Sequence, residues 1–404
     1  YYKPNNMISI SNLVFRMKKN AVGLATIAIL SSMVLVTLVG AASIYAGKKD
    51  YIASVAPHDY SVTGTNVDLT STQKIMDDFL AQSGNQVNEK AEVTYLYFGI
   101  KEQEKNKLTI FPENERKVLP KSIFLVFSQA TYKQLTGKDL NLASNQVGLY
   151  SKSKTLKDQK SLSFNGQTYQ IQDDLNDFIK GKVPNIFTII VSDYNYLVVP
   201  DMDDFKESIK GTATTQATYV GVNVKNPTHD AKKNSDLLDQ MTDKETQQLA
   251  GQNTGVSQSY LTANSQYDTE GMLNGFVGGT LFIGIFLSII FMLGTVLVIY
   301  YKQISEGYED RERFVILQKI GLDDLQVKQT IRKQVLTVFF LPLIFAFIHL
   351  AFAYHMLSLI VRIIGVFNPS LMLVVTIIVC GVFFLAYVLV FALTSRSYRR
   401  IVSM

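Results

Sequence analysis

Lysine side chains gather at one place in the chain where they could bind an anion. Lys152, Lys154, Lys157 and Lys160 lie within nine residues of one another. Ammonium groups at this density can bind phosphate oxygens through charge-assisted hydrogen bonds. The same spacing is also typical of a solvated surface without a ligand. The sequence therefore predicts either a contact with an anion or lipid head group, or an ordinary exposed face.

The other residues able to do chemistry do not form a catalytic motif. The sequence has no G-x-x-x-x-G-K-[ST] phosphate loop, and none of its four histidines lies in an H-E-x-x-H motif. No G-x-S-x-G nucleophile motif occurs either. The single cysteine, Cys380, lies in an apolar segment, where we expect it to pack. We therefore predict that this chain is not an enzyme, with no catalytic residue, no metal site and no cofactor of its own.

Four long windows of the sequence contain no charged residue. They cover residues 21–47, 271–301, 334–361 and 363–395. A helix needs about 20 mainly apolar residues to cross a bilayer. Each window is longer than that, so the sequence predicts four transmembrane helices and excludes a purely soluble protein.

The distribution of charge predicts how these helices are oriented. The net charge of the 404 residues is +5, yet residues 48–270 carry 24 Lys+Arg and 28 Asp+Glu. The rest of the chain carries 15 Lys+Arg and 6 Asp+Glu, and excess Lys and Arg mark the cytoplasmic side. We therefore expect a multi-pass protein of the cell membrane with both termini of this chain cytoplasmic and residues 48–270 outside. Because the positive charge flanks the membrane, nucleic acid is not an expected partner.

The exterior segment shows the patterns of a mixed α/β domain. Alternating apolar residues, a buried apolar run and an Asn165-Gly166 hairpin signal predict strands at 92–100, 217–225, 162–164, 168–171 and 185–191. Helical patterns cover 71–81, 201–210 and 234–249. Residues 254–264, rich in Ser, Thr, Gly and Asn, predict a loop before the second span.

Two features of the spans could serve packing or function. Gly271, Gly275 and Gly279 repeat every four residues, a spacing that lets another helix approach closely. That helix is either one of the chain's own spans or a partner that slides during a working cycle. His349 and His355 lie in the third span, where ionisable residues are candidates for function, although a neutral imidazole bonded to a neighbouring helix is the plainer expectation.

Residues 302–333, between the second and third spans, combine apolar and charged positions. Phe314, Leu317 and Ile320 follow a helical spacing, Gly321 suits the end of that helix, and Asp323 suits the start of the next. Two helices at the cytoplasmic membrane surface could pass force between a soluble partner and the spans. The alternative is an ordinary solvated loop.

Two stretches of the sequence resemble the FtsX-like permeases of ABC transporters. They are N-L-V-F-R-M-K-K-N at 12–20 and F-V-I-L-Q-K-I-G-L at 314–322. Within that family, residues 1–25 and 304–322 are most similar to the bacitracin-type (Bce-like) antimicrobial-peptide permeases. The chain departs from the family pattern at Arg313, where many members carry Glu; here the acid is Glu312.

The resemblance agrees with the charge pattern on the fold class. We expect an α-helical membrane protein with four transmembrane helices plus a large extracellular mixed α/β domain inserted between helices 1 and 2. The expected division is a cytoplasmic amphipathic segment 1–20, helix 1 at 21–47, the exterior domain at 48–270, helix 2 at 271–301, coupling helices at 302–333, helix 3 at 334–361, an outer loop 362–370, helix 4 at 371–395 and a cytoplasmic tail 396–404. Such permeases have ten spans, so six would precede this arrangement.

The resemblance also implies partners and a role. It implies a permease of a Gram-positive bacterium that confers resistance to antimicrobial peptides and takes part in sensing them, with a peptide antibiotic or lipid-linked cell-wall precursor and membrane lipids as its ligands. An ABC ATPase dimer holding ATP and Mg²⁺, and a sensor histidine kinase, would be its partners. The ATPase would dock on Glu306, Glu309, Arg311, Arg313, Phe314, Leu317, Lys319, Gly321 and Leu322. The alternatives are a MacB-like four-span permease that exports lipoproteins or peptides, and a membrane receptor without transport.

Overall fold

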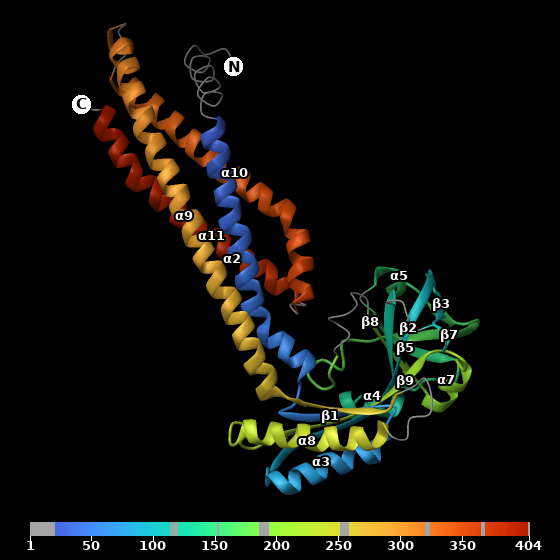
Figure 1. The fold of residues 1–404 in the computed structure, drawn as a ribbon. Coiled ribbons are helices and arrows are strands. Elements are labelled where there is room, and N and C mark those ends of the chain that lie inside the picture. Colours follow the sequence, from blue (N-terminus) through green and yellow to red (C-terminus); the bar gives the residue numbers. More distant parts are fainter. Residues whose placement is uncertain are drawn as a thin grey trace. The chain divides into compact units, whose positions relative to one another are not determined.

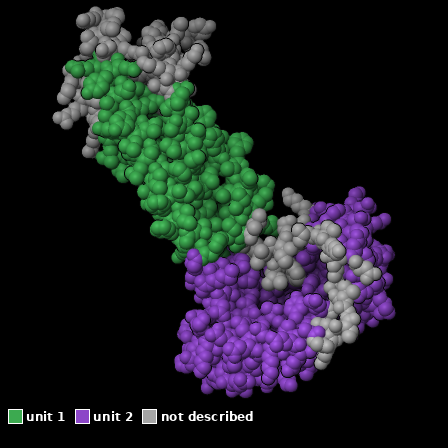
Figure 2. Space-filling model, in the orientation of Figure 1, with its two compact units in different colours: residues 1–48, 276–404 green, residues 49–275 purple. Residues whose placement is uncertain are grey.

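The computed structural model describes residues 21–113, 115, 120–151, 153–185, 194–250, 258–319, 324–364 and 368–402. The chain divides into two compact units, coloured separately in Figure 2. Residues 1–48 and 276–404 form the first, which we call the helical unit. Residues 49–275 form the second, which we call the α/β domain.

The helices of the helical unit confirm the prediction of four spans. They are α2 (Ala21–Val55), α9 (Gln266–Lys319), α10 (Asp324–Ile363) and α11 (Pro369–Val402) (Figure 1). Each contains a stretch long and apolar enough to cross a membrane. The apolar windows of the sequence therefore do mark helices of transmembrane length.

These helices extend past the predicted span boundaries. The second span and the first coupling helix are one continuous helix, α9, with 54 residues. At 1.5 Å per residue α9 is about 81 Å long, more than twice the thickness of a hydrocarbon core. No proline occurs in residues 295–319, and Gly307 is the single glycine, so nothing local ends the helix at the predicted boundary of 301.

The spans pack through close contacts made by α2. A Cβ added at Gly284 of α9 would lie 2.4 Å from the Cβ of Ala41 in α2. On α10, Leu357 contacts Gly40 of α2, where an added Cβ would be 3.5 Å from Leu357 Cδ1. The α10–α11 pair contains a buried bond in which Tyr387 Oη donates to the carbonyl of Phe339 at 2.8 Å. Glycine and alanine thus place α2 close to α9, as is common between membrane helices.

The part of the α/β domain that the structure describes contains ten strands. They are β1 (Tyr60–Thr65), β2 (Val87–Glu104), β3 (Lys107–Ile110), β4 (Ser122–Ser128), β5 (Gln146–Ser151), β6 (Ser161–Phe164), β7 (Gln167–Asp174), β8 (Tyr194–Val199), β9 (Thr214–Val224) and β10 (Tyr260–Ser265). Their order is β10-β1-β9-β2-β3-β6-β7-β5-β8-β4, and β4 also pairs with β2. The pairings from β2 to β4 therefore close a ring of seven strands, while β9, β1 and β10 extend from it.

Helices cover both parts of this sheet. The domain contains α3 (Leu69–Ser83), α4 (Gln129–Thr136), α5 (Lys154–Lys157), α7 (Met202–Ser208) and α8 (Ala231–Ala250). Helices α3 and α8 lie beside β1 (Figure 1). Their side chains Phe79 and Leu238 share a buried core with Tyr60, Val62 and Val222 of β1 and β9. A separate core centred on Phe98, Phe124 and Phe164 lies among the strands of the ring.

Most local predictions for this domain are confirmed. The predicted strands at 92–100 and 217–225 lie in β2 and β9, and the predicted helices are α3, α7 and α8. Residues Asn165 and Gly166 connect β6 to β7 with φ values of 48° and 97°, as a two-residue hairpin turn requires. Of the predicted strand at 185–191, all but the first residue lies outside the described residues.

The predicted loop at 254–264 is wrong over residues 260–264. Residues Tyr260–Ser265 form β10, which pairs with β1 along its whole length. Thr246 of α8 supports this strand, because its hydroxyl bonds both the N–H of Leu261 at 3.0 Å and its C=O at 3.2 Å. Pairing with residues 200 positions away overrides a loop-like composition.

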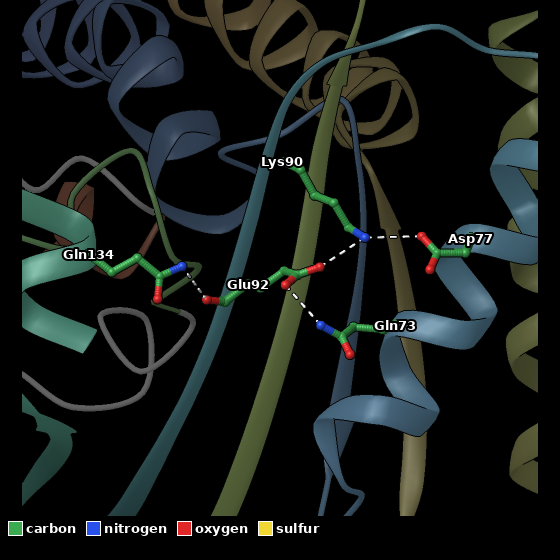
Figure 3. A network of polar contacts seen from close by, with 5 residues as sticks. All are labelled: Gln73, Asp77, Lys90, Glu92 and Gln134. Atoms are coloured by element: carbon green, nitrogen blue, oxygen red, sulfur yellow. Dashed lines mark hydrogen bonds and ion pairs between the residues drawn. The ribbon is translucent and has the colours of Figure 1, made fainter. Parts of the chain in front are cut away.

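A polar network joins two helices to the long strand β2 (Figure 3). Lys90 Nζ lies 3.0 Å from Asp77 Oδ1 of α3 and 2.8 Å from Glu92 Oε1. The Glu92 carboxylate also accepts a bond from Gln73 Nε2 of α3 at 2.8 Å, while Gln134 of α4 donates to its carbonyl at 3.1 Å. Glu92 therefore connects α3 and α4, which pack in separate hydrophobic cores, to strand β2.

Candidate functional site

The α/β domain is joined to two membrane helices through neighbouring strands. β1 follows α2 after residues 56–59, and β10 ends at Ser265, immediately before α9 begins at Gln266. The two strands are antiparallel, with Tyr60 opposite Ser265 and Thr65 opposite Tyr260. Residues 49–55 of α2 and 266–275 of α9 belong to the α/β domain itself. We call this arrangement the junction.

Hydrogen bonds fix both sides of the junction, at the end of α2 and at the start of α9. Asn264 Nδ2 donates to the carbonyl of Val55, the last residue of α2, at 2.9 Å. The backbone N–H of Gln266, the first residue of α9, donates to the carbonyl of Asp59 at 3.0 Å. Thr269 then donates to Asn264 Oδ1 at 3.0 Å. The ends of α2 and α9 are thereby bonded to the same strand pair.

His58 is buried at the junction. Its Nδ1 lies 2.7 Å from Tyr219 Oη of β9, and both side chains are buried. Gly221 provides the space, since a Cβ there would lie 2.6 Å from His58 Nδ1. Burial lowers the pKa of His58 below its ordinary value, and the negative charges of Glu89 and Asp59 only partly oppose this effect. His58 is therefore neutral at pH 7.

Acidification is expected to destabilise the α/β domain through His58. The imidazole of His58 has a pKa of about 6.5 in the unfolded chain, where it binds a proton more readily than in the folded domain. Its contribution to the free energy of unfolding is therefore fully present above about pH 6.5. It falls as pH drops below about 6.5, by up to about 1.4 kcal/mol per unit, until the folded pKa is reached. Proteolysis rates of the domain between pH 8 and 5 measure this.

A matched pair of variants isolates the contribution of His58. His58→Gln is expected to weaken the pH dependence, whereas His229→Gln, which removes an exposed histidine of the same domain, is expected to leave it unchanged. An equal pH dependence in the wild type and His58→Gln would contradict the assignment.

The predicted docking residues are only partly described. Glu309 and Arg311 lie on exposed positions of α9, whereas Glu306 is buried. The buried Gln303, three residues earlier, shares its side of the helix. Four further predicted residues are in α9, where the structure describes the backbone alone: Arg313, Phe314, Leu317 and Lys319. Gly321 and Leu322 lie outside the described residues, so docking stays a prediction.

The glycine repeat has no close neighbour outside its own helix among the described residues. A Cβ added at Gly271, Gly275 or Gly279 would lie within 4 Å of none of their atoms. Gly284, farther along α9, instead lies against α2. Packing at the repeat, by one of the chain's own spans or by a partner helix, stays a prediction.

The structure tests the expectation for His349 but not the one for the lysine group. Lys157 at the end of α5 and Lys160 before β6 are exposed, while Lys152 and the side chain of Lys154 are outside the description. Anion binding by these lysines stays a prediction. For His349, the expected bond to a neighbouring helix is confirmed, since its Nδ1 lies 3.1 Å from Ser32 Oγ of α2.

The fold and the junction define a membrane protein with four candidate spans, two of which carry an inserted α/β domain. No family model matches the chain. Curated relatives over most of its length are ABC transporter permeases of Bacillus subtilis (strain 168). The chain is 24% identical to the ABC transporter permease protein YxdM over 367 residues, which cover 89% of this chain and 53% of the relative.

Two other relatives agree with this class. Identity to the bacitracin export permease protein BceB is 22% over 366 residues, covering 87% of this chain and 51% of that protein. Identity to the uncharacterized ABC transporter permease YvcS is 30% over 122 residues, covering 30% of this chain and 18% of that one. The chain thus spans about half the length of YxdM and BceB. These likenesses confirm the predicted resemblance and indicate an ABC transporter permease.

Proposed function

We propose that this chain forms the part of an ABC permease that couples ATP hydrolysis in a separate ATPase to an exterior domain. We further propose that the permease acts in resistance to, and sensing of, antimicrobial peptides of the bacitracin type. The name of the relative BceB supports the second statement. The charge distribution along the sequence supports an exterior position for the α/β domain.

One observation carries the coupling mechanism. Helix α9 continues without a break from Lys319, near the predicted docking segment, to Gln266, where it follows directly on β10. A helix moves as a stiff rod, because each turn is bonded to the next. Displacement at its cytoplasmic end is therefore transmitted to the β1–β10 pair. Movement of these strands would then shift the α/β domain and release a peptide from a lipid-linked cell-wall precursor.

In this proposal ATP hydrolysis takes place in a partner protein. The sequence has no phosphate-binding loop, so ATP and Mg²⁺ would be held by an ABC ATPase dimer docked on residues 306–322. A sensor histidine kinase in the same complex would detect the working state of the permease. The chain itself contributes force transmission and binding of peptide, precursor and membrane lipids.

Charge placed in the docking segment is expected to remove the ATPase. In the full-length protein, Leu317→Asp and Gly321→Asp are each expected to reduce the ATPase that co-purifies in mild detergent at least tenfold, because a carboxylate replaces an apolar or side-chain-free contact. The same substitution at Gln247, exposed on α8, is the control. A full ATPase complement with intact peptide resistance would show that the docking assignment is wrong. A stable complex that lacks an ATPase even in the wild type would favour a receptor.

A further inference from the structure

The connection that follows β7 also contacts the end of α2. The structure describes residues 175–185 of this connection. The backbone N–H of Asn185 donates to the carbonyl of Ser54, in the last turn of α2, at 2.7 Å. Lys180 Nζ of the same connection lies 3.9 Å from Asp50 Oδ1, one turn earlier in α2. The end of α2 is therefore bonded to this connection as well as to β10.

The side chain of Asn185 extends this contact into the ring of seven strands. Its Nδ2 donates to Tyr196 Oη of β8 at 2.9 Å. Asn185 and Tyr196 are both buried, with 4% and 1% of their surfaces exposed. Tyr196 in turn stacks on Tyr150 of β5, with the ring centroids 4.8 Å apart. Asn185 thus joins the backbone of α2 to side chains of two strands of the ring.

The connection itself is held firmly by packing. The ring centroid of Phe178 lies 5.3 Å from that of Phe127 in β4 and 5.0 Å from that of Tyr132 in α4. Ile179 and Val183 are each 1% exposed in the same core, and the Val183 N–H donates to the Ile179 carbonyl at 3.0 Å. A close-packed turn transmits strain instead of absorbing it. A displacement of α2 therefore reaches β8 through this turn.

The two membrane helices at the junction contact different parts of the α/β domain. Helix α9 follows directly on β10, which lies outside the ring, whereas α2 is also linked to β8, a strand of the ring. The path from α2 to β8 along the sheet is longer, since it passes from β1 through β9, β2 and β4. A hydrogen bond between buried groups is costly to break, because the separated groups do not regain water.

We propose that Asn185 is a positioning residue whose two hydrogen bonds make the ring of seven strands follow the end of α2. With this link, a tilt of α2 moves the ring and the β1–β10 pair together. Without it, movement reaches β8 only across the sheet, and the ring lags behind the helix. The consequence for transport rests on the proposed function, whereas the link between α2 and the ring does not.

The distance between two spin labels tests the link without the ATPase. One label is placed at Lys49 of α2 and the other at Gln172 of β7, a strand of the ring; both positions are exposed. The full-length permease is reconstituted in liposomes, with Cys380 and any further cysteine replaced by Ser. Pulsed electron paramagnetic resonance gives the distribution of the distance between the labels. We expect one narrow distribution in the wild type, because the ring is bonded to α2.

The stacked tyrosine pair provides a variant and its matched control. Tyr196→Phe removes the hydroxyl that accepts from Asn185 and keeps the aromatic ring. It is expected to raise the population at displaced distances about fivefold, as the loss of one buried hydrogen bond does. Tyr150→Phe removes a hydroxyl that lies 3.5 Å from Asp177 Oδ2 and is expected to leave the distribution narrow. Adding Asn185→Ala to Tyr196→Phe is expected to change little further, since both substitutions break the same bond.

The distances and the resistance of cells are read separately. An unchanged distribution in Tyr196→Phe, or equal broadening in Tyr150→Phe, would overturn the proposal. Tyr196→Phe is also expected to lower peptide resistance while the ATPase still co-purifies. Broadened distances together with full resistance would support the link between α2 and the ring, and would count against the proposed function of the movement.

Discussion

A Gly-Ser-Gly insertion between Ser265 and Gln266 is expected to abolish peptide resistance while the ATPase still co-purifies with the permease. The insertion separates β10 from α9 where this strand and this helix join directly. It also disrupts the bond from the Gln266 N–H to the Asp59 carbonyl and the one from the Asp268 N–H to Ser265 Oγ. A flexible tripeptide cannot transmit the displacement of a stiff helix. Resistance of cells to the peptide and recovery of the ATPase are measured together.

The same tripeptide inserted after Lys138 provides the control. Lys138 is exposed in the connection between α4 and β5, away from the junction. Connections of this kind tolerate added residues, so resistance is expected to be retained. Protease resistance of the α/β domain must be equal in the two variants. Resistance that survives the insertion at Ser265 would show that α9 does not transmit the movement through β10.

Gly284→Ala is expected to destabilise the helical unit by about 1 to 3 kcal/mol, the usual effect of adding a methyl group to a filled core. The new Cβ would lie 2.4 Å from the Cβ of Ala41 and 3.4 Å from the carbonyl oxygen of Thr37. Both neighbours belong to α2, so the helices must move apart. The hydrogen-bond contact between Thr37 and Ser288, at 3.1 Å, would be lost as well. Thermal unfolding in detergent measures the effect.

Gly381→Ala is the matched control for this substitution. Gly381 lies in α11, and a Cβ added there would meet no atom within 4 Å. Replacing Gly381 by alanine is expected to leave the stability of the helical unit unchanged or to raise it slightly, because alanine favours a helix more than glycine does. Equal stability of the two variants would contradict the close packing of α2 on α9 at Gly284.

The parts of the fold that depend on local pattern could be predicted from the sequence. Charge-free windows identify spans because the bilayer selects them by length and polarity alone. The β6–β7 hairpin was predictable from Asn165 and Gly166, because the turn itself requires residues that accept positive φ. The helical spacing of residues 302–319 predicted a helix there, although the sequence does not show that this helix and the second span are one continuous helix, α9.

The features set by distant partners could not be predicted. Strand β10 has the composition of a loop and is a strand only because β1 pairs with it. The close approach of Gly284 to α2 was not predicted either, since it depends on where two helices cross. The junction was also missed, because His58 and Tyr219 are 161 residues apart in the sequence.

The register of the junction limits how α9 can move. A piston movement of α9 along its axis, relative to α2, would pull β10 past β1. A slip of one residue, about 3.4 Å, would turn Leu261 and the other inward side chains of β10 from the core to the opposite face. Such a slip would expose apolar surface and break the bonds of the strand pair together. The ends of α2 and α9 at the junction therefore keep a fixed axial offset, and the movements left to them are tilting and rotation as a pair.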